Sequence, residues 1–222
     1  MKKNQTMVLI ALAAMAIAAV SCATTTPEAA QAKSDRQRAA EASLPIRTEP
    51  AVRPDWIDNV PDSAALQSFV GTSLRMTRAN LARNAAMEDG REQLIDYYGT
   101  LIENKARTHT ATFGIANEVL SPQIAGQQLR NRVATNLSQA LAARNYYTEV
   151  YLMNNTNEEG FEVYVLMQID KAIVKRFLDN YGQEQAADLA RKAAAEQDAR
   201  RRQQLEKAAE FFGGNLSSTM GL

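Results

Sequence analysis

The chain has 222 residues, and its 25 basic and 25 acidic side chains give a formal net charge of zero. This balance excludes the basic footprint of a nucleic-acid-binding protein and the polybasic patch of a protein that binds membranes through charge. One cysteine and one histidine are too few for a disulfide or a cysteine–zinc site, and they supply the usual nucleophile–base sets poorly.

Residues 1–21 have the pattern of a secretory signal peptide. Lys2 and Lys3 precede an apolar run of 14 residues from Met7 to Val20. The run is shorter than the roughly 20 apolar residues that span a bilayer, and it fits the roughly 7–15 residues of a signal-peptide core. The alternatives are an ordinary signal peptide followed by an unrelated cysteine, and a single-pass membrane helix.

The end of this run, Ala19-Val20-Ser21-Cys22, resembles the lipobox of bacterial lipoproteins. The resemblance implies that the Cys22 sulfur receives a diacylglyceryl group, that the chain is cleaved before Cys22, and that the new amino terminus is acylated with a fatty acid such as palmitate. In that class an aspartate after the cysteine implies retention in the inner membrane, so Ala23 favours the outer membrane. Cys22 is therefore the predicted lipidation site. The protein is expected to be anchored there, facing the periplasm or the cell surface.

The rest of the chain divides into three parts. Residues 22–50 are predicted to be a flexible tether, because they are rich in Thr, Ala, Glu and Pro and have no sustained apolar period. Residues 51–182 are predicted to form an α+β domain. Residues 183–222 are predicted to form a charged helix, with a frayed tail after Phe212. The apolar stripe of this helix needs a partner, either the domain itself or another copy of the chain.

The first half of the domain is predicted to contain a strand and a long helix. Residues 67–76 form the strand, in which Gly71 marks a bulge or a close approach. Residues 77–108 form the helix, and Gly90 within it is expected to face another backbone. His109 is interpreted as a polar surface residue or a cap at the helix end.

The second half is predicted to contain a helix, a hairpin and another helix. Ser121-Pro122 is a typical helix start, and that helix is expected to run to about Ala143. Residues 145–153 and 161–169 are predicted to be the strands of an antiparallel hairpin. Asp170 is predicted to cap a helix that begins at Lys171, and Gly182 is predicted to end or bend it. The fold class is thus α+β, with a small three-stranded antiparallel sheet packed on long helices in the order β-α-α-β-β-α.

With this order, the chain resembles the LPP-twenty family of outer-membrane lipoproteins over about residues 54–181. The residues that carry the resemblance are Pro54-Asp55-Trp56, Phe69-Val70-Gly71, Ala82 with Ala86 and Arg91, and Tyr164 to Asp170. The resemblance implies a dodecin-like fold with a long helix lying across the sheet, and no enzymatic residues. Some relatives are structural lipoproteins of flagellar motors that assemble into rings or disks.

The leading functional prediction is a structural, scaffolding or protein-interaction role in the cell envelope, with a second copy or an envelope protein as partner. A flagellar-motor association is included in this prediction. The alternative is a periplasmic module that binds a small ligand, using Trp56 and Tyr146, Tyr147, Tyr151 and Tyr164 as stacking surfaces. About half of these tyrosines are expected to face the helices. Trp56 is also interpreted as a lid on the core. No catalytic residue, cofactor or metal site is predicted, and no nucleic-acid partner.

Overall fold

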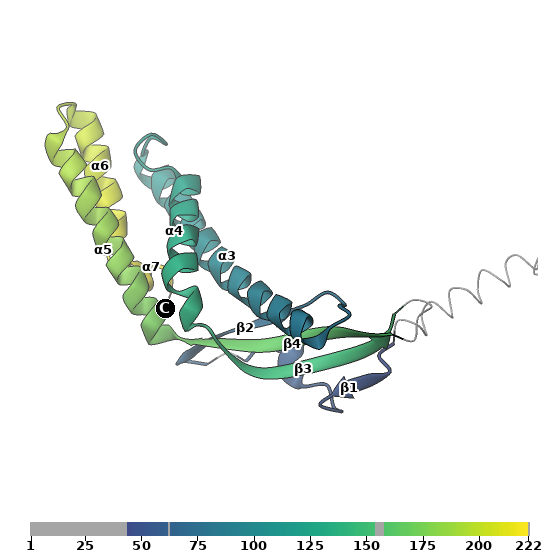
Figure 1. Cartoon of the computed structure of the whole chain (residues 1–222). Coiled ribbons are helices and arrows are strands. Elements are labelled where there is room, and N and C mark those ends of the chain that lie inside the picture. Colours follow the sequence, from purple (N-terminus) through teal and green to yellow (C-terminus); the bar gives the residue numbers. More distant parts are fainter. Residues whose placement is uncertain (1–43, 62, 154–157, 222) are drawn as a thin grey trace, which may run out of the picture. The chain divides into compact units, whose positions relative to one another are not determined.

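A computed structural model of the chain describes residues 44–61, 63–153 and 158–221. The chain forms two units, Met1–Leu44 and Pro45–Leu222, and the second unit contains the elements described here. In the described residues the fold is mixed α and β, with five α-helices and a four-stranded antiparallel sheet (Figure 1). The elements are, in chain order, β1 (Arg47–Glu49), η1 (Asp55–Ile57), β2 (Leu66–Thr72), α3 (Ala79–Phe113), α4 (Pro122–Asn136), η2 (Ser138–Ala140), β3 (Ala142–Leu152), β4 (Glu159–Asp170), α5 (Lys171–Ala195), α6 (Ala199–Gly213) and α7 (Leu216–Thr219).

The strands of the sheet lie in the order β1-β3-β4-β2. The three predicted strands correspond to β2, β3 and β4, and β3 pairs with β4 as the predicted hairpin. The prediction of only three strands is wrong, because Arg47–Glu49 pairs with β3 as a fourth strand. The sequence pattern did not predict this strand, because it has only three residues and no apolar alternation. It was therefore included in residues 22–50, the predicted tether. Residues 22–43 of that segment lie outside the described residues.

Helix α3 packs on one face of the sheet along a row of small residues that includes Ala82, Ala86 and Gly90. Gly71 of β2 lies directly against the backbone of Ala86 and Gly90. A Cβ atom on Gly71 would lie 2.7 Å from the Gly90 nitrogen and would overlap the Ala86 carbonyl oxygen. Both glycine predictions are therefore confirmed, because the missing side chains let helix and strand backbones touch.

Helix α3 continues past the predicted end at Thr108. It ends at Phe113, and Gly114 follows in a left-handed conformation with φ 62°. The Gly114 nitrogen donates a hydrogen bond to the Thr110 carbonyl, which is typical of a glycine that ends a helix. His109 therefore lies inside the helix and does not cap it.

Helix α4 begins as predicted. The Ser121 hydroxyl accepts a hydrogen bond from the Ile124 nitrogen, and Pro122 is the first helical residue. The helix ends at Asn136, earlier than the predicted Ala143, because η2 and the first residues of β3 occupy the rest of that segment.

Helix α5 begins as predicted and ends later than predicted. Asp170 accepts a hydrogen bond from the Ala172 nitrogen at 2.7 Å and caps the helix. The helix then continues through Gly182 to Ala195. A Cβ atom on Gly182 would lie 2.5 Å from the Phe212 carbonyl oxygen, so this glycine permits close contact with α6.

The C-terminal residues fold back on α5. Residues 196–198 interrupt the charged helix that was predicted between residue 183 and Phe212, and α5 packs against α6 (Figure 1). The apolar stripe of α6 is buried within the chain, which supplies the partner that the stripe needs. The prediction of a frayed tail is wrong for residues 216–219. They form α7, Leu216 is fully buried, and the Ser217 nitrogen donates to the Asp179 carboxylate at 3.0 Å.

Candidate functional site

The predicted lipidation site, Cys22, and the apolar run before it lie outside the described residues. Across residues 44–61, 63–153 and 158–221, no helix combines the length and the apolar character that a bilayer crossing requires. Two polar clusters in this part of the chain are candidates for a functional site, one on the sheet and one between α3 and α4.

The first cluster lies on the sheet face away from α3. Gly71 meets α3, so its register partner Val165 points to the same face. Side chains alternate along a strand, so Tyr164 and its cross-strand partner Tyr147 point to the opposite face. Glu149, two residues beyond Tyr147, shares that opposite face.

Arg53, in the segment between β1 and η1, is the centre of this cluster. Its Nη1 atom donates to the Glu149 carboxylate at 2.8 Å, and its other guanidinium nitrogens donate to Asp58 at 3.2 and 3.3 Å. The guanidinium also lies 5.1 Å from the centre of the Tyr164 ring and 5.8 Å from that of Tyr147. Only 8% of Glu149 is exposed, and a carboxylate this buried needs a charged partner. Arg53, Asp58, Tyr147, Glu149 and Tyr164, called here the Arg53 cluster, hold the segment before β2 on the sheet.

Two tyrosine hydroxyls extend the hydrogen bonding. Tyr151 donates to Glu149 at 2.6 Å, and Tyr164 donates to Glu162 at 2.9 Å. Burial raises the pKa of Tyr164 to about 12, and the hydrogen bond to Glu162 adds to the rise. Burial, together with Glu149, also raises the pKa of Tyr151. These phenols stay protonated at neutral pH, whereas a general acid or base works best with a pKa near the operating pH.

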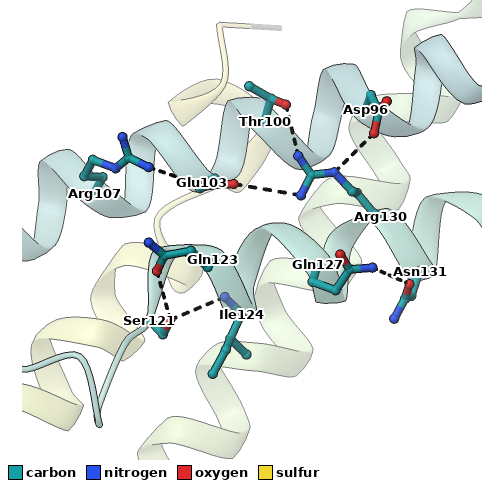
Figure 2. A network of polar contacts seen from close by, with 10 residues as sticks. All are labelled: Asp96, Thr100, Glu103, Arg107, Ser121, Gln123, Ile124, Gln127, Arg130 and Asn131. Atoms are coloured by element: carbon teal, nitrogen blue, oxygen red, sulfur yellow. Dashed lines mark hydrogen bonds and ion pairs between the residues drawn. The ribbon is translucent and has the colours of Figure 1, made fainter.

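The second cluster joins α3 to α4 and is shown in Figure 2. From α4, Arg130 donates to Asp96 at 3.3 Å and to the Thr100 hydroxyl at 3.1 Å, and it lies 3.8 Å from the Glu103 carboxylate. The Arg130 side chain lies over Gly99 of α3, where a Cβ atom would be 2.7 Å from the guanidinium Nε. The cluster therefore fastens the two helices together where a glycine lets them approach.

His109 has a different place from the one predicted. It is half-buried, and its ring packs against Phe113 and Phe211 with centroids 4.6 and 5.0 Å apart. Its Nε2 atom lies 3.0 Å from the Lys207 carbonyl oxygen and therefore donates a hydrogen bond to it. His109 thus joins α3 to α6. Within the described ranges, no group of three or more His, Cys, Asp or Glu side chains could hold a metal ion.

The aromatic residues predicted as stacking surfaces are already in contact with the chain itself. Tyr146 points to the α3 face, where Arg83 lies 4.6 Å from its ring centre. Tyr147 and Tyr151 are buried, and the Arg75 guanidinium lies 3.4 Å from the Tyr151 ring centre. Trp56 is half-buried in η1 and is not among the side chains packed on the main core, so it does not act as the predicted lid.

Sequence reasoning missed Arg53, Glu149 and Arg130. The signal for Glu149 was its position between Tyr147 and Tyr151 on one strand face, because a carboxylate among aromatic residues there needs a partner. Arg53 and Arg130 carried no such signal, because their partners Glu149 and Asp96 lie 96 and 34 residues away in the sequence.

Comparison of the chain with protein-family models, with curated proteins and with solved structures found no match.

Proposed function

We propose that this chain is a lipoprotein of the bacterial outer membrane, acylated at Cys22 and exposed to the periplasm or the cell surface. The observation that carries the proposal is Ala19-Val20-Ser21-Cys22 directly after the apolar run of residues 7–20. The Cys22 thiol supplies the nucleophile for the thioether, and several acyl chains anchor more firmly than one because each buried methylene adds about 0.8 kcal/mol. Mass spectrometry of the amino-terminal peptide tests this. An acylated Cys22 as first residue is expected, and cleavage elsewhere or an unmodified Cys22 would contradict it.

The role proposed for the folded unit is structural or interactive, without enzymatic activity. This is supported by the way the polar clusters are used. Arg53 and Arg130 each join distant segments, and their partners are side chains of the same chain. Such clusters make a unit rigid, whereas catalytic groups need perturbed pKa values matched to proton or electron transfer.

We further propose a relationship to the LPP-twenty family and the dodecin-like arrangement that this relationship implies. Among the residues that carry the resemblance, Phe69, Gly71, Ala82 and Ala86 lie where α3 packs on the sheet. An experimental structure of a family member in which the long helix lies on a sheet with another strand order would contradict this relationship.

The proposed partner is a second copy of the chain or another envelope protein, with flagellar-motor components among the candidates. The outer edge of β2 supports this proposal. In the strand order β1-β3-β4-β2, β2 is an edge strand, and β1 pairs along the far edge of β3. Asp89 accepts from the Thr72 nitrogen at 2.7 Å, and Gln93 donates to the Val70 carbonyl at 2.9 Å, so α3 protects one end of this edge. Residues 66–69 are left for pairing with a partner strand.

Light scattering of the processed, acylated chain in detergent tests the partner proposal, together with crosslinking in the intact envelope. A mass of two or more copies, or a defined crosslinked protein, is expected. A monomer at every concentration with no crosslinked partner would contradict it.

Binding of a small ligand is a second candidate, favoured by one hollow in the surface. It has a volume of about 230 Å³ and lies between the α3–α4 loop and α5, with Leu120, Ile124, Leu189 and Phe212 in its lining. Ile124 is 59% exposed there. A thermal-shift screen of envelope metabolites tests this role, and the absence of any stabilising compound would contradict it.

A further inference from the structure

Four exposed apolar side chains lie at one end of the sheet, where β3 ends and β4 begins. They are Ile46, Leu74, Leu81 and Leu152, with exposed fractions of 54, 84, 47 and 48%. We call these four residues the apolar rim. Single exposed apolar residues are common, but a group of them indicates a surface that contacts another body.

The pairing of the strands brings these residues to the same end. The Ile46 nitrogen donates to the Val150 carbonyl at 2.7 Å, which places Ile46 beside the last residues of β3. Leu152 is the last residue of β3 and pairs with Glu159. On the other side of β4, Met76 pairs with Phe161, so Leu74 lies near the first residues of β4.

Leu81 belongs to the first turn of α3, which begins three residues after Met76. Neighbouring strands lie about 4.8 Å apart, so a row from β1 across β3 and β4 to residues 74–76 is about 15 Å wide. The paired helices α3–α4 and α5–α6 extend away from this end (Figure 1). The rim therefore faces away from most of the exposed helical surface.

The chain enters the folded unit at the same end. Pro45 is the first residue of the unit and directly precedes Ile46 of the rim. Cys22 lies 23 residues before Pro45. At 3.3–3.6 Å per residue, even a fully extended segment holds Cys22 within about 80 Å of the rim. A membrane that binds the acyl chains of Cys22 is thus tethered to the folded unit at the end that carries the rim, with this distance as the upper limit.

The charges around the rim are balanced. Arg47 pairs with Glu49 at 3.2 Å and with Glu159 at 3.3 Å, and Arg75 covers the ring of Tyr151. Arg78 and Glu158 are exposed and of opposite sign. Attraction to anionic headgroups is therefore weak here. The feature that remains is apolar, which matches the boundary between headgroups and acyl chains of a bilayer.

We propose that the apolar rim docks on the lipid bilayer that holds the acyl chains of Cys22, so that the folded unit stands on the membrane by this end. The proposal rests on the proposed lipid anchor and adds an orientation to it. The attachment of the chain at the rim selects a bilayer over a second copy as the occupant, because the anchor brings the bilayer there. A bilayer also accepts side chains from four separate segments without a matching rigid surface.

A fluorescent label at residue 74 tests this contact. In the acylated protein Cys22 forms a thioether, so the substitution Leu74→Cys introduces the only free thiol. Leu74 is 84% exposed, and its replacement leaves the core untouched. The matched control is Ile124→Cys on α4, which is 59% exposed and belongs to the helices that extend away from the rim. Both labelled proteins are inserted in phosphatidylcholine–phosphatidylglycerol vesicles that carry nitroxide-labelled lipids, and flotation confirms the insertion.

We expect the nitroxide lipids to lower the fluorescence at residue 74 at least two-fold, to leave the label at residue 124 nearly unchanged, and to give the same result at high salt. Two equally bright labels on a protein that floats with the vesicles would overturn the docking and leave the anchor standing. Equal quenching of both labels would also overturn it, because the contact would not be confined to the rim. An acylated protein that does not float with the vesicles would overturn the anchor itself.

Discussion

The contact between Gly71 and Gly90 makes a sharp prediction about stability. The substitution Gly71→Ala adds a Cβ atom that would lie 2.7 Å from the Gly90 nitrogen and would overlap the Ala86 carbonyl oxygen. Both neighbours are backbone atoms of α3, so no side-chain rotation relieves the overlap and the helix must move from the sheet. Overpacking of a well-packed core costs about 1–3 kcal/mol and occasionally more, and we expect the upper part of that range, about 3 kcal/mol.

Urea unfolding and thermal unfolding, both followed by circular dichroism, measure this loss. A change of 1 kcal/mol shifts the melting temperature of a unit of this size by about 2–4 °C, so a drop of about 6–12 °C is expected. The matched control is Gly213→Ala in α6, where a Cβ atom would lie 3.5 Å from that of Ala186, an ordinary contact. There the exchange should be neutral or should stabilise by up to about 1 kcal/mol. A Gly71→Ala protein as stable as the wild type would refute the packing of α3 on β2.

Three further predictions concern the polar groups. Arg53→Met leaves the Glu149 carboxylate, 8% exposed, without its charged partner, and should lower the free energy of unfolding by about 2–4 kcal/mol in urea. Adding Glu149→Gln should recover part of this loss, and a single substitution without effect would contradict the Arg53 cluster. Arg130→Met removes contacts with Asp96 and Glu103 at the surface and should lower the free energy of unfolding by about 1 kcal/mol. A double-mutant cycle with Asp96→Asn should give a coupling energy above about 0.5 kcal/mol. Burial raises the pKa of Tyr181 to about 12, so between pH 10 and pH 12 this tyrosine ionises only in the unfolded chain. Tyr181 alone should therefore contribute about 2 kcal/mol to the loss of stability of the wild type over that range. The Tyr181 hydroxyl is buried and has no partner in the described residues. Tyr181→Phe should therefore match the stability of the wild type at pH 7 and lose less stability above pH 10. An equal alkaline loss in both proteins would contradict the ionisation of Tyr181 as its origin.

Local patterns were enough to predict much of the fold. The hairpin of β3 and β4, the caps at Ser121 and Asp170, and the two glycine contacts follow from strand periodicity, cap chemistry and the absence of a side chain. Each of these signals lies within a few residues of the feature that it predicts.

The errors have a common origin in packing between distant segments. The threonines around His109 are weak helix formers, but His109 and Phe113 contact α6, and this contact carries α3 to Phe113. Gly182 costs helix propensity in the same way, but it lets Phe212 approach, so α5 continues. β1 has three residues and forms because β3 offers a free edge.

The candidate functional residues differ in the same way in how well the sequence predicts them. Cys22 was predicted because its motif is contiguous, whereas the Arg53 and Arg130 clusters each join residues from separate elements and have no contiguous motif. A lone arginine in a sequence gives no indication of the carboxylate that it will meet. Those clusters could be found only once the strands and helices were placed together.

The lipid anchor at Cys22 is the central claim, and membrane fractionation of a Cys22→Ser protein tests it most directly. Serine lacks the sulfur that accepts the diacylglyceryl group. Cys22 does not belong to the unit Pro45–Leu222, so the substitution should leave the fold of that unit unchanged. The wild type should remain in the membrane fraction after washing with high salt. The Cys22→Ser protein should move to the soluble fraction with an unchanged circular dichroism spectrum. A folded Cys22→Ser protein that stays firmly bound to the membrane would contradict the account.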